Sequence, residues 1–451
     1  MKIINANVFH EEGFFQPGEI EIAGGVFVKT PSDGSGAKKS ASFSGDNGKT
    51  AVDRETVYDA RGCYAIPGLI DIHLHGCVGG NFYEADVNEL VKMLRYQAQN
   101  GVTAVCPTTL TLPEEALARA CAAISAAAGL VARSSPQLPD ETGPAAGSSA
   151  KASGSTGSVT KSSADDTGAV EPAASSLGSS SDAAYAAAPV GVYLEGPFIS
   201  PQKCGAQNPA YAVPPDIGMV RRLISASDGL VKILALAPEI EGAMQLIKKL
   251  AGEVTISIAH TNADYAEAVA AFRRGASHVT HLYNAMSAFS HRAPNVIGAA
   301  LDTPGVTAEL VLDGLHLHPA AVRIAMRCLG PDRAVFISDS MMATGLGDGT
   351  YDLGGLSVKV TGREARLVEG GNIASSVSNL MDCLRVAVKE VGIPLADAVR
   401  CASVNPARVV GAQNERGRIA AGMAADLVIL DEDLNIVKVF IRGRPADGGL
   451  N

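Results

Sequence analysis

The chain has 451 residues, 47% of them hydrophobic, and a formal net charge of −10 at pH 7. This acidic balance argues against nucleic acid or an anionic membrane as a partner, although one local cation would allow a phosphorylated small molecule to bind. The N-terminal sequence MKIINANVFH has no apolar signal segment, and the eight cysteines show no paired spacing. We therefore expect a cytoplasmic protein with no membrane span and with reduced, mostly buried thiols.

Both ends of the chain predict short β-strands separated by turn residues. Residues 1–65 alternate apolar and polar positions between Gly turns, and residues 415–451 do the same over three expected strands. Neither end has enough apolar residues for a core of its own. We expect the two ends to pack together as one small β-sandwich domain, interrupted by a low-complexity insertion over about residues 30–55.

The central residues 66–414 alternate apolar runs with helical patterns, which is typical of βα units around a parallel sheet. Eight expected strands indicate an α/β fold, a (β/α)8 TIM-type barrel, whose catalytic groups lie at the C-terminal ends of the strands. A Ser/Ala/Gly-rich stretch over about residues 133–184 is too poor in large apolar residues to fold, and we expect a disordered insertion there. The expected strands end near Asp71, Cys106, Glu195, Ala237, His260, His281, Asp313 and Asp339.

The first of these strands leads into the segment DIHLHG, which contains His73 and His75. Because successive side chains of a strand point to opposite faces, the two imidazoles point the same way. Such a pair could bind a metal ion or could be hydrogen-bonded to the backbone at a strand end. The segment alone leaves both interpretations open.

Three further strand ends carry one carboxylate and two imidazoles, Glu195, His260 and His281. Three protein ligands with room left for water are the pattern of a catalytic metal site. The two histidines of the first strand could then hold a second ion, with Glu195 or the water shared between the ions. Asp339 ends a buried strand and would be the general base beside a metal-activated water. Together these residues predict a metal-dependent hydrolase.

Signals for the substrate are weaker. The segment NAMSAFSHR offers Asn284, the backbone around Ala285 and Arg292, whose guanidinium matches phosphate geometry but could equally be a surface charge. The segment LDGLHLHP places His316 beside the expected pocket. His318 precedes a proline and is expected to begin a helix.

The segments PGLIDIHLHG, LEGPFIS, AHTNADY, THLYNAM, DGLHLHP and SDSMMATG follow one another in this order, and together they resemble the N-acetylglucosamine-6-phosphate deacetylases of the amidohydrolase superfamily. The similarity extends over nearly the whole chain apart from the two insertions. It implies hydrolysis of N-acetyl-D-glucosamine 6-phosphate to D-glucosamine 6-phosphate and acetate, a step of amino-sugar catabolism. It also implies one or two divalent ions (zinc, iron, manganese or cobalt) on Glu195, His260 and His281, with Asp339 as acid and base.

The resemblance further implies substrate contacts from Asn284, Ala285 and His316, and a homodimer in which Arg292 binds the 6-phosphate in the neighbouring active site. Some members of the family lack both histidines of the first motif and use one metal, whereas this chain keeps them. In KCGAQNPAY, Gln207 stands where the family has a substrate-contacting histidine. Since Gln can donate a hydrogen bond but cannot become a cation, N-acetylgalactosamine 6-phosphate stays open as the substrate.

Two other classes of function compete with this interpretation. A hydrolase of cyclic amides would be expected to carry a carboxylated lysine at the end of the fourth strand, but Lys232 stands at the start of that strand. A non-catalytic barrel would be expected to have lost a ligand or the base, and the sequence retains all of the expected ones.

Overall fold

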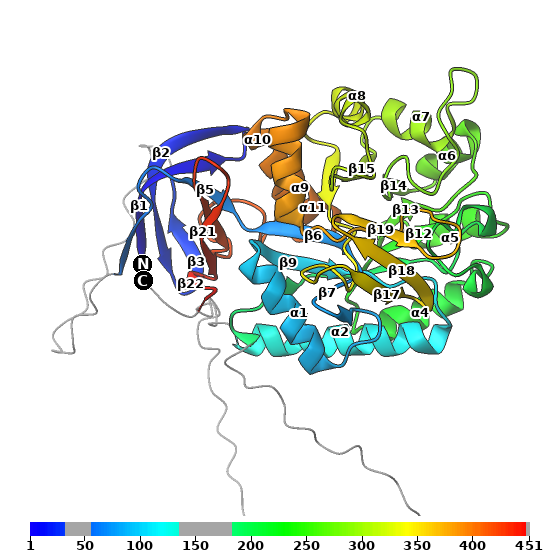
Figure 1. The fold of residues 1–451 in the computed structure, drawn as a ribbon, viewed down its shortest axis with the longest axis horizontal. Helices are drawn as coiled ribbons and strands as arrows, with labels where there is room; N and C mark the ends of the chain where they lie inside the picture. The colour runs from blue at the N-terminus through cyan, green and yellow to red at the C-terminus, as the bar shows by residue number, and fades with distance from the viewer. Residues whose placement is uncertain (32–55, 135–182, 448–451) are drawn as a thin grey trace, which may run out of the picture.

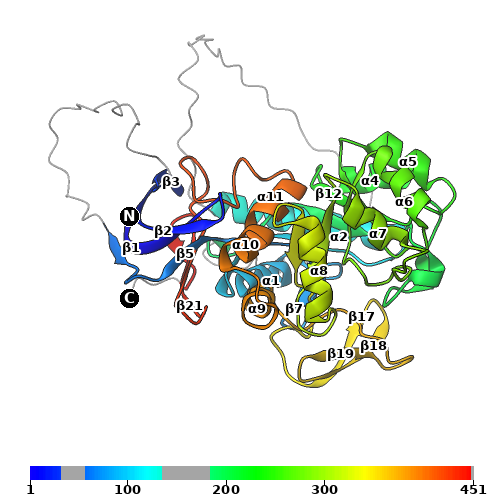
Figure 2. The same cartoon turned by 90° about the horizontal axis from the view of Figure 1, so that it is seen from above.

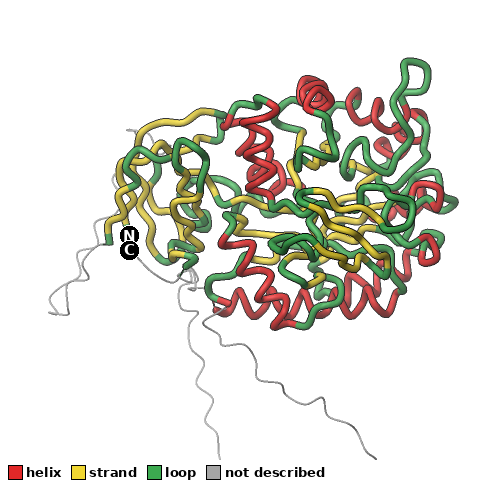
Figure 3. Tube along the Cα trace, in the orientation of Figure 1, coloured by secondary structure: helices red, strands yellow, loops and turns green. Residues whose placement is uncertain are grey.

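The computed structural model describes residues 1–31, 56–134 and 183–447 (Figure 1). Most of the two expected insertions, about residues 30–55 and 133–184, lies outside these described residues. The residues at their margins are ordered, because Thr30 and Ala183 are buried and the helix before the second insertion ends at Ser134. The described chain has a mixed α/β part and, beside it, a part built of strands and loops from both chain ends (Figure 3).

Eight strands of the α/β part coincide with the eight that the sequence predicts. Six of them form one parallel sheet in chain order, and the other two lie in a three-stranded parallel sheet of order β10-β9-β6. The eight strands are β6 (Leu69–Leu74), β9 (Val102–Pro107), β11 (Val192–Glu195), β12 (Val231–Leu236), β13 (Thr255–Ile258), β14 (Ala276–Val279), β15 (Thr307–Val311) and β16 (Ala334–Ile337). The third strand of the smaller sheet, β10 (Ala188–Pro189), is additional to the eight.

Backbone contacts connect the two parallel sheets at both of their edges. Thr108, just after β9, pairs with Tyr193 of β11, and the amide of Thr109 donates to the carbonyl of Tyr193 at 2.9 Å. On the other side, the amide of Asp339 donates to the carbonyl of His73 at 2.9 Å. The C-terminal ends of the first and last strands of the series therefore meet at residues that the sequence singled out.

Helices alternate with these strands, and several have the sequence signals that begin a helix. Asp86 and Glu89 form a capping box at the start of α1, and His318 caps α8 with Pro319 as its first residue. The helices are α1 (Val87–Gln99), α2 (Glu114–Ser134), α4 (Ile217–Ala226), α5 (Ala243–Leu250), α6 (Tyr265–Arg273), α7 (Asn295–Asp302), α8 (Pro319–Leu329), α9 (Leu380–Val386), α10 (Leu395–Val399) and α11 (Asn405–Val409). Single turns are η1 (Pro201–Lys203), η2 (Pro209–Tyr211), η3 (Ala387–Val391) and η4 (Arg400–Val404).

Helix α2 corrects one expectation. By length and composition it is, among the described helices, the one that could cross a membrane, whereas the sequence was expected to contain no such segment. The residues Leu117, Cys121, Ile124 and Val131 of α2 are buried. Core helices of globular proteins meet the same test, so this one helix is weak support for a membrane span.

Strands from both chain ends form a single sheet of order β22-β21-β20-β5-β1-β2-β3, with β4 pairing beside β1. The two ends thus share one core, which includes Ile3, Phe27, Leu427 and Phe440. The strands are β1 (Lys2–His10), β2 (Phe14–Ala23), β3 (Val26–Lys29), β4 (Val57–Asp59), β5 (Tyr64–Pro67), β20 (Leu427–Leu430), β21 (Ile436–Ile441) and β22 (Arg444–Pro445).

Only Gly68 separates β5 of this sheet from β6 of the α/β part. Its amide donates to the carbonyl of Asp426 at 3.0 Å, and a Cβ atom at this position would lie 2.0 Å from Oγ1 of Thr103. Glycine is therefore required where the chain passes from one sheet to the other.

A small antiparallel sheet lies between β16 and α9 and was not predicted from the sequence. Figure 2 shows it projecting from one side of the α/β part. It shares a core with Leu110 and Met341, which lie near the C-terminal ends of the parallel strands. Its strands are β17 (Gly349–Leu353), β18 (Leu356–Thr361) and β19 (Glu364–Leu367), and a separate two-stranded pair consists of β7 (Gly76–Cys77) and β8 (Gly80–Asn81).

Candidate functional site

The C-terminal ends of the parallel strands bring six ionisable side chains together. They come from β6 and the residue after it, from the end of β11, and from the positions just beyond β13, β14 and β16. All six are buried, and they form two groups in which the potential ligand atoms lie within 4.8 Å of one another. One group is His73, His75 and Asp339, and the other is Glu195, His260 and His281.

In the second group, three atoms converge on one point. Oε1 of Glu195 lies 3.0 Å from Nε2 of His260 and 3.0 Å from Nε2 of His281, and the two imidazole nitrogens are 3.2 Å apart. Nδ1 of His260 donates to the carbonyl of Lys203 at 2.9 Å, which leaves the lone pair of Nε2 facing Glu195. Such a convergence of acceptors is stabilised by a cation between them.

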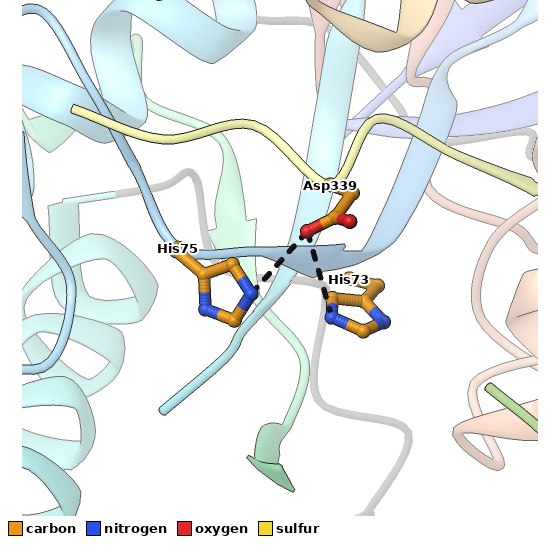
Figure 4. Close-up of side chains that lie close together, drawn as sticks. All are labelled: His73, His75 and Asp339. Carbon is orange, nitrogen blue, oxygen red and sulfur yellow. Dashed lines mark ion pairs between the residues drawn. The ribbon is translucent and has the colours of Figure 1, made fainter. Parts of the chain in front are cut away.

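In the first group, one oxygen of Asp339 faces both imidazoles of the DIHLHG segment (Figure 4). Oδ1 of Asp339 is 3.3 Å from Nε2 of His75 and 3.9 Å from Nε2 of His73. Glu195 lies between the two groups, because its Oε1 is 3.5 Å from Nε2 of His73 and its Oε2 is 3.4 Å from Nε2 of His75. Nε2 of His73 is buried and has no hydrogen-bond partner among the described residues. Each group thus has side chains that could hold a divalent ion, and Glu195 would lie within reach of an ion in either group.

The electrostatics of the site favour ionised carboxylates. Burial raises the pKa of Glu195, but with the imidazoles protonated the charges of His73 and His260 and the hydrogen bonds from His260 and His281 outweigh it and hold that pKa well below its usual range. Burial likewise raises the pKa of Asp339, and the hydrogen bond and charge of His75 bring it below its ordinary value. Asp339 is consequently in the basic form that can accept a proton.

Backbone strain accompanies three of the six residues. His260, His281 and Asp339 have φ angles of 45°, 27° and 50°, in the left-handed region that side chains with a Cβ atom rarely adopt. Strain of this kind costs of order 1–3 kcal/mol per residue and is found mainly at functional sites. The turn at each strand end aims the side chain into the pocket rather than along the sheet.

Sequence reasoning missed a buried carboxylate behind the histidines. Oε2 of Glu309, in the middle of β15, lies 2.8 Å from Nδ1 of His73 and accepts the backbone amide of His281 at 3.0 Å. Its Oε1 lies 3.0 Å from Nε2 of His278. Burial raises the pKa of Glu309, but His73 and His278 together hold it well below its usual value. An acidic residue within the apolar run TAELVL was the available signal.

Two further polar residues near the site were also missed. Asp71 is fully buried in β6, and burial raises the pKa of its carboxyl to about 7 despite hydrogen bonds from the amides of His73 and Ser338. The hydroxyl of Ser375 donates to the main-chain carbonyl of Asp339 at 2.5 Å and lies 3.3 Å from its Oδ1. The sequence around Ser375 gives no signal for this contact.

The six side chains open into a cavity of about 250 Å³. The expected contact residues Asn284, Ala285, His316 and Gln207 line it, whereas Arg292 is exposed and does not. A larger cavity of about 610 Å³ lies elsewhere, near the N-terminal ends of β12–β14, and contains none of the six. The smaller cavity is lined by His75, Leu110, Glu195, Gly205, Ala206, Gln207, His260, His281, Asn284, Ala285, His316, Asp339, Leu353, Asn372, Ile373 and Ser375.

Two of the lining residues are held by specific partners. Nδ1 of His316 lies 2.7 Å from Oδ2 of Asp313, and this pairing raises the pKa of His316 even though burial lowers it. The side-chain amide of Gln207 donates to Oε2 of Glu195 at 2.5 Å, and its Oε1 accepts the backbone amide of Thr111 at 2.6 Å. Gln207 therefore contacts a candidate metal ligand directly.

A pocket at the strand ends of a parallel α/β sheet, with two groups of histidine and carboxylate side chains, is typical of metal-dependent hydrolases. Residues 64–446 match the model of the amidohydrolase family. The chain belongs to the amidohydrolase family, whose members are hydrolases.

Comparisons with individual proteins give relatives whose activities are more narrowly defined than that of the family. The chain is 34% identical over 382 residues to an N-acetylglucosamine-6-phosphate deacetylase of Bacillus subtilis, with 84% of each chain covered. It is 32% identical to an N-acetylgalactosamine-6-phosphate deacetylase of Escherichia coli O157:H7, covering 84% of this chain and 87% of that one. A solved structure of a mutant N-acetyl-D-glucosamine-6-phosphate deacetylase from Mycobacterium smegmatis, in complex with N-acetyl-D-glucosamine-6-phosphate, superposes with a TM-score of 0.77 at 30% identity over 99% of both chains.

Proposed function

We propose that this protein is a metal-dependent deacetylase that hydrolyses N-acetyl-D-glucosamine 6-phosphate to D-glucosamine 6-phosphate and acetate. The observation that carries the proposal is the arrangement of Glu195 between two histidine-containing groups, with Asp339 beside them, in a chain 34% identical to a deacetylase of that substrate. The cavity of about 250 Å³ is of a size to accept the acetamide end of a sugar.

The metal requirement follows from the donor set. Glu195, His260 and His281 would hold one ion, and His73, His75 and Asp339 would hold or approach a second. Imidazole and carboxylate ligands suit zinc, iron, manganese or cobalt. A bound divalent ion polarises a carbonyl oxygen and lowers the pKa of water.

Asp339 is placed to move the protons of the reaction. Its carboxylate accepts a proton from the attacking water as the oxygen bonds to the acetamide carbon. The same proton then passes to the amide nitrogen as the carbon–nitrogen bond breaks, because an amide anion is too basic to leave. The products are acetate and the free amine, and Asp339 returns to its starting state.

Substrate recognition is assigned to the residues around this centre. Asn284, the backbone at Ala285 and His316 line the cavity and offer hydrogen-bonding groups to the sugar. Arg292 is exposed and outside the cavity of its own subunit, which suits a homodimer in which it binds the 6-phosphate in the neighbouring site. Gln207 would contact the sugar and would also hold Glu195 in place through its hydrogen bond to that carboxylate.

The fold proposed to support this chemistry is a closed (β/α)8 barrel over residues 66–414. The contacts of Thr108 with Tyr193 and of Asp339 with His73 support closure at both edges of the parallel sheets. Residues 1–65 and 415–451 form the second domain, and the core that the strands of both chain ends share supports their packing as one unit.

The test is a substrate panel assayed for acetate release by enzyme loaded with a defined metal. N-Acetylglucosamine 6-phosphate, N-acetylgalactosamine 6-phosphate and unphosphorylated N-acetylglucosamine are compared by kcat/KM. The proposal requires the first to be the best substrate. A preference for the galactosamine ester would assign the chain to the activity of its Escherichia coli relative. Absence of acetate from all three with metal bound would overturn the proposal.

A further inference from the structure

Glu309 is a charged residue in an otherwise apolar part of the strand. It lies on β15 between Ala308 and Leu310, and its side chain is 0% exposed. A buried carboxylate is costly unless hydrogen bonds and charges compensate it. The groups that offset the cost of burying Glu309 therefore indicate its role.

Among the described residues, the hydrogen-bond partners of the Glu309 side chain all belong to histidine residues near the site. Oε2 accepts a hydrogen bond from Nδ1 of His73 at 2.8 Å and another from the backbone amide of His281 at 3.0 Å. Oε1 accepts from Nε2 of His278 at 3.0 Å, and Nδ1 of His278 lies 2.6 Å from the hydroxyl of Thr307. One carboxylate thus connects the first histidine motif with the strained turn at His281.

The contact with Nδ1 determines which nitrogen of His73 is free. When Nδ1 carries the proton that Glu309 accepts, Nε2 has a lone pair, and this is the atom that lies 3.5 Å from Glu195 and 3.9 Å from Asp339. His75 has no such carboxylate on its Nδ1, which is buried without a partner among the described residues. Of the two imidazoles in the first group, Glu309 therefore orients that of His73 and not that of His75.

We propose that Glu309 is a positioning residue that fixes His73 as a metal ligand and ties it to the His281 turn, so that the chain is built to hold two ions. This inference rests on the proposed function only in requiring a divalent ion in the site. Outer carboxylates that orient metal-bound histidines typically contribute about 10- to 100-fold in metal affinity. A role in packing alone would weaken folding without selecting one of the two ions.

The experiment compares Glu309→Gln with the matched control His278→Asn, which removes another partner of the same carboxylate but leaves its contacts with His73 and His281. Each protein is stripped of metal, titrated with Zn²⁺ and separately with Mn²⁺, and analysed for ions bound per subunit by mass spectrometry of the metals. Thermal unfolding of the metal-free forms reports on folding.

We expect two ions per subunit in the wild type and in His278→Asn. Glu309→Gln is expected to bind one ion with wild-type affinity and the second about 10- to 100-fold more weakly. If Glu309→Gln does not fold, Glu309→Asp replaces it, because the shorter carboxylate keeps the charge but loses the reach to His73; the same selective weakening is expected.

Three results would overturn the inference: a wild type that binds one ion, a Glu309 variant that binds both ions normally, or equal losses in the Glu309 and His278 variants. Acetate release is measured in parallel and separates this inference from the proposed function. Two ions with selective loss in Glu309→Gln but no acetate from any substrate would leave the positioning role standing and remove the deacetylase assignment.

Discussion

Oδ1 of Asp339 lies 3.3 Å from Nε2 of His75, so a carboxylate from the end of β16 directly faces an imidazole that follows β6. The last and first strands of the parallel series meet at this contact. Because the pKa of Asp339 lies below its ordinary value, the carboxylate is available as a base at neutral pH.

Asp339→Asn is expected to lower kcat by about 10²–10⁴-fold, because an amide cannot accept and return the proton. The ion on Glu195, His260 and His281 should remain, as measured by metal content. Ser375→Ala serves as the control, since it removes only a hydroxyl contact to Asp339 and should cost about tenfold or less. Activity of Asp339→Asn within tenfold of wild type would show that another group moves the proton.

Gln207→Leu should weaken metal binding and kcat/KM by about tenfold or more. The substitution removes a hydrogen bond to the charged Glu195 and leaves the buried amide of Thr111 without its acceptor. Gln207→Glu, which has a side chain of equal size, should lower metal affinity and kcat/KM further, because two carboxylates would then face each other. Metal titration and steady-state kinetics measure these changes. Wild-type metal affinity and kcat/KM in Gln207→Leu would show that the hydrogen bonds of Gln207 are not needed and that its role is packing alone.

Arg292→Ala should raise KM for the phosphorylated substrate by about tenfold or more, with little change for an unphosphorylated analogue, because the proposed contact of the guanidinium is with the phosphate alone. Arg292 is exposed, so the melting temperature should stay close to wild type. Arg119→Ala, which removes another exposed cation, controls for net charge. Equal losses on both substrates would remove Arg292 from phosphate binding.

Asp71→Asn should make the protein more stable at alkaline pH. Burial raises the pKa of Asp71 from its ordinary 3.8 to about 7, so the folded state binds a proton that the unfolded state has lost between these values. Stability therefore falls as pH rises through this window, and it stays at the lower level above about pH 7. The asparagine variant avoids this loss, and its advantage should grow by up to about 3 kcal/mol between about pH 5 and about pH 8.

Urea denaturation of the metal-free proteins measures this difference. Asp433→Asn is the control, because that carboxylate is 85% exposed and should leave the pH dependence unchanged. A constant difference between wild type and Asp71→Asn across the range would mean that Asp71 is ionised in the folded protein throughout.

The sequence was most informative where a polar residue ends an apolar run. Glu195, His260, His281 and Asp339 could be predicted to meet because parallel strands end at one edge, and the structure brings them within one pocket. The partner of Glu309 could not be predicted in this way. Its position within β15 shows that a carboxylate is buried, but which histidines it contacts depends on neighbouring strands far away in the chain.

Other features depended on pairing that local patterns do not specify. The terminal strands were expected to form a sandwich, and the described ones belong to a single sheet in which β5 lies between β1 and β20. The sheet of β17–β19 was not predicted, because residues 349–367 follow the last strand of the expected barrel and no element was assigned to them. Leu353, which it contributes to the pocket, was consequently missed as well.

The junction at Gly68 has a consequence for how the protein is made. One edge of β5 pairs with residues 427–430, far later in the chain, while β6, which contains His73, follows after a single residue. The strand that presents His73 thus begins beside an edge that stays unpaired until residues 427–430 have been synthesised. Pairing of β5 therefore depends on residues made long after the first strand of the site, and removal of β20 would disturb the pocket from a distance.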